Sequence, residues 1–213
     1  MHVPRSIQNM GRLQQCCLEL GGKSPAIIHS DVNISDAARR IAFGKFVNNG
    51  QTCIAPDYLF VHRSVADKFL SALISETTRL FGNGTIVPGD AKSYGRISNQ
   101  QHFQRLQNIL DDAIKQEWKP LLSGINLPKT RFFHPTILMG SEKNVQLMDE
   151  EIFGPILPVM LYDNINDTIS FINSRPKPLA LYVFSSSKKI CNQITANTSS
   201  GRDRKSTRLN SSH

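Results

Sequence analysis

The chain has 213 residues, enough for one large domain or two small ones with a sizeable core, and 39% apolar with 20% charged residues is typical of a globular protein. No apolar run approaches the roughly 20 residues that cross a bilayer, and the four cysteines form neither a disulfide framework nor a CxxC metal spacing, so a reducing compartment is expected. The net charge of +8 does not indicate a nucleic-acid partner, because half of it lies in residues 1–17 and 203–213 and the rest is dispersed.

Short apolar runs alternate with segments of helical periodicity after residue 17, and no internal repeat is present. In chain order the pattern predicts a strand over 24–30, a helix over 33–49, a strand over 57–62, a helix from a Ser64–Asp67 capping box to Leu80, a loop over 81–90, a helix over 99–116, strands over 134–139 and 155–162, a helix around 167–172 and a strand over 179–185. This alternation predicts an α/β fold, a parallel-type sheet with helices on both faces.

Sites in such folds lie in loops beyond the strand ends, and three loops hold candidates: LELGGKSP (18–25), GQTC (50–53) and EEIFGP (150–155). Cys53 follows a predicted helix and a Gly-Gln-Thr turn, so its sulfur is expected in a loop. A free thiol with a pKa of about 8.5 is a weak nucleophile at neutral pH unless loop amides or positive charge activate it. Taken alone, a cysteine is more often a small buried apolar residue, which is the interpretation for Cys16, Cys17 and Cys191.

Glu19 stands between Leu18 and Leu20, immediately before Gly21. Burial there would raise its pKa toward the range of a general base, but a solvent-facing edge residue or a helix-terminus partner is the simpler interpretation of this residue alone. The EEIFGP loop is equally ambiguous by itself. Its carboxylates either accept hydrogen bonds from sugar hydroxyls beside an aromatic ring, or form a charged turn before a strand.

Together the three motifs resemble the catalytic domain of aldehyde dehydrogenases, with Glu19 placed 34 positions before Cys53 and EEIFGPILP about a hundred residues further on. The surrounding sequence is similar to the class 3 group, which includes the fatty aldehyde dehydrogenases. The segments that carry this similarity are NNGQTCIAPDY, FINSRPKPLALYVFS and the closing TSSG. The resemblance covers residues 18–201 as a partial catalytic domain. Residues 1–17 match the family poorly, which is expected if they are translated from a mispredicted upstream exon.

The resemblance implies oxidation of an aldehyde to a carboxylic acid with NAD or NADP. Cys53 is implied as the nucleophile that forms a thiohemiacetal and then a thioester, with its own backbone N–H in the oxyanion hole. Glu19 is implied as the general base that activates water. Glu151 is implied to bind the nicotinamide ribose hydroxyls with Phe153 close to the nicotinamide, and Leu20 and Gly21 to line the cofactor's path. No metal is implied.

The resemblance also implies that the chain is truncated at both ends. A cofactor-binding domain with a Rossmann-like loop and an oxyanion-hole asparagine would precede residue 18, and Asn48 and Asn49 do not match that asparagine. An oligomerisation strand and any membrane anchor would follow Gly201, since residues 203–213 equal the translation of a common sequencing-library adapter. We expect a small-molecule aldehyde substrate, a homo-oligomer at full length, a location in the cytoplasm or on the cytosolic face of an internal membrane, and no activity from these 213 residues alone.

Three other functions stay open from the sequence. A non-catalytic piece that pairs with full-length subunits would co-purify with them. A cofactor-independent thiol esterase built on Cys53 and Glu19 would lose its activity in a Cys53→Ser variant. Nucleic-acid binding would require salt-sensitive retention on DNA that survives deletion of residues 203–213.

Overall fold

The computed structural model describes residues 21–82, 94–141 and 146–200. Their helices and strands are β1 (Pro25–Ile28), α1 (Ile34–Phe46), β2 (Tyr58–His62), α2 (Ala66–Phe81), α3 (Gln100–Lys115), β3 (Lys119–Leu122), β4 (Thr136–Met139), α4 (Gln146–Asp149), β5 (Ile156–Tyr162), α5 (Ile165–Asn173), β6 (Tyr182–Phe184) and α6 (Lys188–Asn197). Short 3-10 turns occur at Val47–Gly50, Arg63–Val65 and Pro128–Thr130. The predicted alternation of strands and helices is confirmed.

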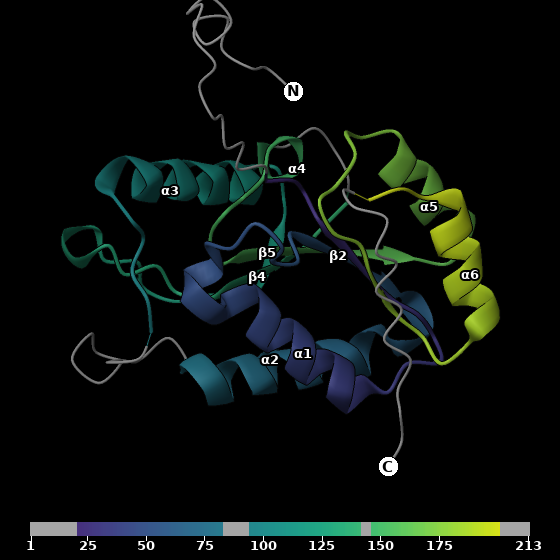
Figure 1. The fold of residues 1–213 in the computed structure, drawn as a ribbon. Coiled ribbons are helices and arrows are strands. Elements are labelled where there is room, and N and C mark those ends of the chain that lie inside the picture. The colour runs from purple at the N-terminus through teal and green to yellow at the C-terminus, as the bar shows by residue number, and fades with distance from the viewer. Residues whose placement is uncertain (1–20, 83–93, 142–145, 201–213) are drawn as a thin grey trace, which may run out of the picture.

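Six strands form one mixed sheet in the order β3-β4-β5-β2-β1-β6 (Figure 1). Strand β1 pairs in parallel with β2 and β6, and β5 pairs in parallel with β2 and β4. Strand β3 was not predicted and is antiparallel to β4. Its residues are exposed or half-buried, and Pro120 has no N–H to donate, which suits an edge strand. The predicted parallel arrangement therefore holds for five of the six strands described.

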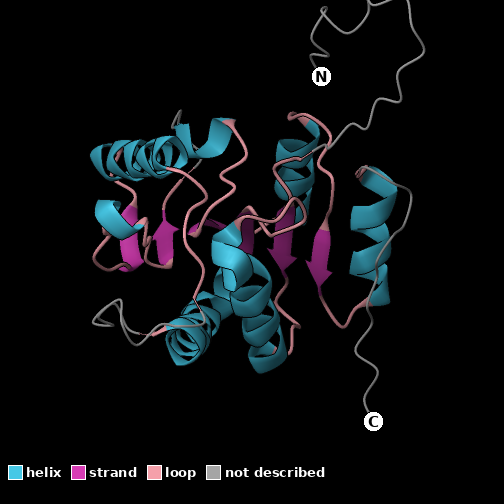
Figure 2. Ribbon diagram, turned by 60° about the vertical axis from the view of Figure 1, so that its left-hand side comes forward, coloured by secondary structure: helices cyan, strands magenta, loops and turns pink. Residues whose placement is uncertain are grey.

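Helices cover both faces of the sheet, as predicted (Figure 2). One face packs on α1 and α2 around Phe46 and Phe69, and the other packs on α3, α4, α5 and α6 around Phe103. Successive side chains of β2 serve both layers, because Leu59 belongs to the first cluster and Phe60 to the second. Strands buried on both faces read as continuous apolar runs rather than alternating ones, which is why they were recognisable in the sequence.

The capping box predicted at Ser64 and Asp67 is wrong. The backbone N–H of Ser64 donates to Nδ1 of His62 (3.2 Å), which caps a 3-10 turn instead. Helix α2 then begins at Ala66, after Val65, whose side chain makes no capping hydrogen bond. The imidazole of the last β2 residue supplies the acceptor that the serine was expected to provide.

Helix α3 begins where the periodicity placed it, with Asn99 as N-cap accepting from the His102 N–H (2.7 Å). Most of the predicted loop over 81–90 lies outside the described residues, which resume at Tyr94. No helix in the described part of the chain is long and apolar enough to span a membrane.

Candidate active site

The loops that carry the predicted site residues lie at one edge of the sheet, the amino edge, where the parallel strands begin. Residues 21–24 lead into β1, residues 50–57 into β2 and residues 150–155 into β5. Two of them are joined by a backbone hydrogen bond from the Asp57 N–H to the Ser24 carbonyl oxygen (2.7 Å). The described parts of the three motifs therefore share one edge, although open α/β sheets more often hold their sites at the carboxyl ends of the strands.

Cys53 lies in the irregular loop before β2, as predicted, and is partly exposed. The backbone leading to it is left-handed at Asn48 (φ 52°), Asn49 (φ 59°) and Gly50 (φ 71°), so the helix predicted over 33–49 ends early. A Cβ on Gly50 would lie 2.3 Å from the carbonyl oxygen of Gly154. Glycine is required there, because the Cys53 loop packs directly on the EEIFGP loop.

Glu151 is half-buried against the backbone of Gly21, where an added Cβ would lie 2.0 Å from the Glu151 Oε2 atom. Burial and the charge of Asp57 raise the pKa of Glu151, while the backbone N–H of Gly22 and two nearby lysines oppose this shift. A cavity of about 310 Å³ opens beside this carboxylate and extends to Arg175. A carboxylate with acceptor capacity therefore faces a space bordered by two glycines.

Phe153 lies at the same edge and adopts a left-handed backbone (φ 48°). Its ring meets the His102 ring edge to face, with the centroids 6.0 Å apart. Burial and the charge of Arg105 lower the pKa of His102, whereas a hydrogen bond with the Phe153 backbone raises it. The predicted cofactor residues Gly21, Glu151 and Phe153 are thus grouped at the amino edge with Cys53.

Glu19 and Leu20, the predicted base and a predicted cofactor residue, lie outside the described residues, as do Cys16 and Cys17. Cys191 is buried within α6, and burial raises the pKa of its thiol. Its interpretation as a small buried apolar residue is confirmed.

A buried carboxylate, Asp57, connects the loops of this edge and was not predicted. The Nζ of Lys23 donates to the Asp57 Oδ2 (2.6 Å) and also to the carbonyl oxygens of Leu147 (2.8 Å) and Glu150 (2.9 Å). The Asp57 Oδ1 accepts from the backbone N–H of Ile152 (3.1 Å). An acidic residue directly before a buried strand was the available sequence signal, because aspartate is rarely buried without a partner.

Lys45 lies beneath the same carboxylate and is fully buried. Its Nζ is 3.9 Å from the Asp57 Oδ1 and makes no hydrogen bond within the described residues. Burial lowers the pKa of Lys45 to about 8, although Asp57 opposes the shift. The signal for this residue was its position four residues after Ile41, on the apolar stripe of α1.

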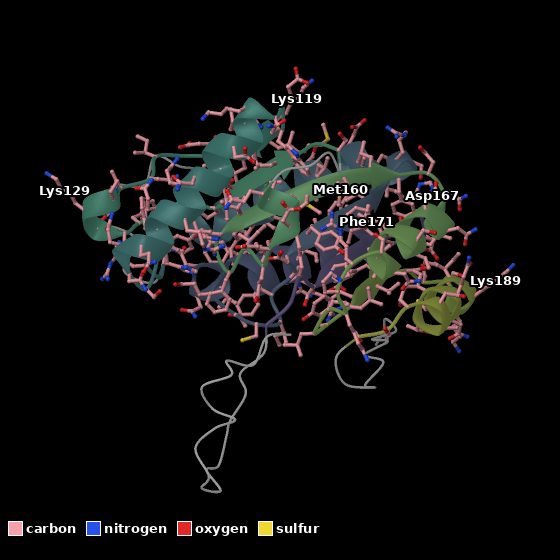
Figure 3. All side chains as sticks on the ribbon, turned by 90° about the horizontal axis from the view of Figure 1, so that it is seen from above. Lys119, Lys129, Met160, Asp167, Phe171 and Lys189 are labelled. Atoms are coloured by element: carbon pink, nitrogen blue, oxygen red, sulfur yellow. The ribbon has the colours of Figure 1, made fainter. Side chains whose placement is uncertain are left out.

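A larger cavity, about 600 Å³, lies away from the three motifs, between the segment that follows α3 and helix α5, near the carboxyl ends of β2, β4 and β5. Figure 3 shows its lining residues Met160 and Phe171 with Asp167 and Lys119. It contains none of the predicted site residues. Within the described ranges, no group of three or more His, Cys, Asp or Glu side chains could hold a metal ion.

A loop-borne thiol and a half-buried carboxylate thus lie at the same edge of a mixed α/β sheet that helices cover on both faces. The model of the aldehyde dehydrogenase family matches residues 2–203. The chain belongs to this family.

Its relatives include members of the class 3 group. The chain is 43% identical over 184 residues to aldehyde dehydrogenase family 3 member A2 of Mus musculus, and this alignment covers 86% of the chain and 36% of that protein. The chain is 40% identical over 184 residues to the dimeric NADP-preferring aldehyde dehydrogenase of Rattus norvegicus, and this alignment covers 86% of the chain and 39% of that protein. The substrate-bound AldH structure of Staphylococcus aureus matches with a TM-score of 0.78 at 39% identity, covering 85% and 38%. The chain spans about two fifths of the length of these relatives, and the class 3 resemblance is confirmed.

Proposed function

We propose that the protein containing this chain oxidises aldehydes to carboxylic acids with NAD or NADP, with Cys53 as the nucleophile. The observation that carries this proposal is the contact of Gly50 with Gly154, which packs the Cys53 loop against the loop that bears Glu151. The Cys53 thiol and the Glu151 carboxylate are thereby held at one edge of the sheet. Membership of the aldehyde dehydrogenase family supports the same reaction class.

In the proposed reaction the Cys53 thiolate adds to the aldehyde carbon, which forms a C–S bond and a thiohemiacetal oxyanion stabilised in part by the Cys53 backbone N–H. Collapse of this oxyanion expels hydride from the same carbon and leaves a thioester on sulfur; the nicotinamide group supplies the hydride acceptor. Glu19 then takes a proton from a water molecule, and the oxygen of that water attacks the thioester carbon. The C–S bond breaks, and the carboxylic acid and the thiolate are released.

The residues present fit part of a nicotinamide cofactor. Glu151 has a carboxylate with acceptor capacity at a cavity, and Gly21, which lines the same cavity, has no side chain that would displace this carboxylate. We assign Glu151 to the ribose hydroxyls and Phe153 to a place against the nicotinamide. Leu20 and Gly21 are proposed to line the path of the cofactor.

Assembly and location are part of the same proposal. The rat relative is named as a dimeric, NADP-preferring enzyme, which supports a homo-oligomer and a nicotinamide cofactor for the full-length protein. The proposed substrate is a small-molecule aldehyde, and the proposed location is the cytoplasm or the cytosolic face of an internal membrane.

The test replaces Cys53 in the protein that contains this chain. Cys53→Ser is expected to abolish the formation of reduced cofactor from a medium-chain aldehyde, followed by its absorbance, because the hydroxyl is far less nucleophilic than the thiolate. The matched control is Cys191→Ser, which alters a buried thiol in α6 and should keep activity. Glu19→Gln should give one burst of reduced cofactor followed by slow turnover, because thioester hydrolysis has lost its base. Full turnover by Cys53→Ser would disprove the assignment.

A further inference from the structure

The side chain of Gln51 ties the Cys53 loop to the segment that leads into α3. Its Nε2 donates to the carbonyl oxygens of Arg96 (3.0 Å) and Asn48 (3.1 Å), and its Oε1 accepts from the backbone N–H of Ser98 (2.9 Å). Both kinds of group on the amide are therefore used, and only a side-chain amide offers two donors and an acceptor at one end. A glutamate here would set a carboxylate oxygen against two carbonyl oxygens.

Arg105, on the second turn of α3, holds the EEIFGP loop in a comparable way. Its guanidinium donates to the carbonyl oxygen of Glu151 (3.3 Å) and to that of Ile152. These two carbonyls immediately precede Phe153, whose left-handed backbone turns the chain. The Arg105 Nε also reaches the His102 Nδ1 (3.4 Å). A planar guanidinium suits two adjacent acceptors, whereas a single ammonium does not match that geometry.

Gly154 is the point where α3 and the two loops meet. A Cβ on Gly154 would lie 2.5 Å from the Leu106 Cδ2 atom, and a Cβ on Gly50 would lie 2.3 Å from the Gly154 carbonyl oxygen. The EEIFGP loop is thus in close contact with both the helix and the Cys53 loop. Because the backbone at Gly154 is closely packed on both sides, a movement of the helix would also shift the Cys53 loop.

We propose that the start of α3 sets the position of the Cys53 thiol relative to the Glu151 carboxylate, with Gln51 and Arg105 as positioning residues. The inference rests on the proposed function, in which both groups must meet one pair of aldehyde and cofactor. Gln51 fastens the thiol loop to Arg96 and Ser98, directly before the N-cap of α3, and Arg105 fastens the carboxylate loop to the second turn of the helix. The continuous segment that runs into α3 therefore holds both loops in register.

The test measures how fast iodoacetamide alkylates each cysteine, by peptide mass spectrometry at one fixed pH. Gln51→Glu and Arg105→Gln are each expected to speed alkylation of Cys53 about fivefold or more, the factor expected when a loop loses the net contribution of a hydrogen bond. Buried Cys191 in the same sample is the internal reference and should change by less than about twofold.

The matched control variants are Gln104→Glu and Arg79→Gln, which alter exposed side chains whose hydrogen bonds to described residues lie within their own helices. Both should leave the alkylation of Cys53 unchanged. In the double variant Gln51→Glu/Arg105→Gln, the alkylation rate of Cys53 should rise by less than the product of the two single increases, because both residues act through the segment that runs into α3. Arg105→Lys tests the same contact with a smaller disturbance, and should lie between the wild type and Arg105→Gln.

Two results would overturn the inference. One is a normal Cys53 rate in both Arg105 variants, because Arg105 would then not act on the thiol loop. The other is acceleration of Cys191 in parallel with Cys53, which would indicate general loosening of the domain. Neither readout depends on turnover, so failure here is distinguishable from failure of the proposed function, which would appear as aldehyde oxidation by Cys53→Ser.

Discussion

The amino and carboxyl edges of the same sheet hold their loops by opposite means. At the amino edge, Lys23 and Asp57 join the loops before β1 and β2 at 2.6 Å, with side chains only 11% and 4% exposed. At the carboxyl edge, Arg63 and Asp163 join the loops after β2 and β5 at 3.0 Å, with side chains 59% and 67% exposed. The first pair is removed from water and makes further hydrogen bonds, whereas the second is solvated. Each pair joins the loops of adjacent parallel strands, so burial is the main difference between them.

The carboxyl edge instead ends in packed rings. His29, His62 and Tyr162 follow or terminate β1, β2 and β5, and the His29 Nδ1 lies 2.9 Å from the Tyr162 hydroxyl. The His62 ring meets the Tyr162 ring edge to face at 5.2 Å. Burial lowers the pKa of His29, although Asp31 opposes the shift. Fixed charge with restricted solvent is thus found at the edge that carries the predicted site, where the proposed reaction would require precise placement of its groups.

The largest expected effect comes from removing one carboxylate at each edge. Asp57→Asn should lower the free energy of unfolding by about 3–5 kcal/mol, because Lys23 and Lys45 would keep buried positive charge without its partner. The matched change at the carboxyl edge, Asp163→Asn, should stay within about 0.5 kcal/mol, because that pair is solvated. Urea unfolding monitored by circular dichroism measures both. Equal losses in the two variants would show that burial does not distinguish the edges.

Much of this sheet could be predicted from the sequence because its strands are buried and its helices are amphipathic. The apolar runs that became β1, β2 and β5 and the periodic segments that became α1, α2 and α3 each carry a local signal. The edge strand β3 was missed, since Lys119 and Pro120 lack both apolar continuity and alternation. The loop position of Cys53 also followed from the sequence, because GQTC stands between a helical pattern and a strand.

The remaining parts of the site depend on partners far along the chain. Gln51 bonds to Ser98, and Arg105 to Glu151, across separations of 47 and 46 residues. The acceptors are largely backbone carbonyls, which every residue possesses, so no sequence pattern marks them. The left-handed Asn48 and Asn49 were missed for a related reason: the helical pattern of α1 continues into residues that the packing of the loop bends away.

Gly50 allows a second test of the amino edge. Gly50→Ala should lower the free energy of unfolding by about 2–4 kcal/mol, because φ is +71° and the new Cβ would lie 2.3 Å from the Gly154 carbonyl oxygen. The matched control is Gly44→Ala in α1, where the Cβ would meet Pro56 at an ordinary 3.7 Å. Alanine loses less backbone entropy on folding than glycine, so the control should be more stable by about 0.5–1 kcal/mol. A stable Gly50→Ala protein would mean that the two loops are not in tight contact.

The smallest expected effect is the pH dependence that Lys45 gives the amino edge above about pH 8. With the pKa of Lys45 lowered to about 8, the unfolded chain binds a proton that the native protein has lost at pH values between this pKa and the ordinary lysine value. The native state is therefore favoured as pH rises through this window, and it loses this advantage as pH falls through 8. The contribution of Lys45 to stability should rise by about 1–2 kcal/mol between about pH 8 and pH 9.5. Cysteines and tyrosines of the unfolded chain also titrate near this window, so the contribution is measured against a variant.

Lys45→Met should remove that rise, because methionine fills the space without a proton to release. The matched control is Lys115→Met, which alters an exposed lysine at the end of α3 as Lys45 stands near the end of α1. Urea unfolding at several pH values gives the slope for each protein, and the difference from wild type isolates Lys45 from the tyrosines. Parallel curves for wild type and Lys45→Met would mean that Lys45 keeps its proton throughout the window, and that the charge at the amino edge is better compensated than its single contact with Asp57 at 3.9 Å implies.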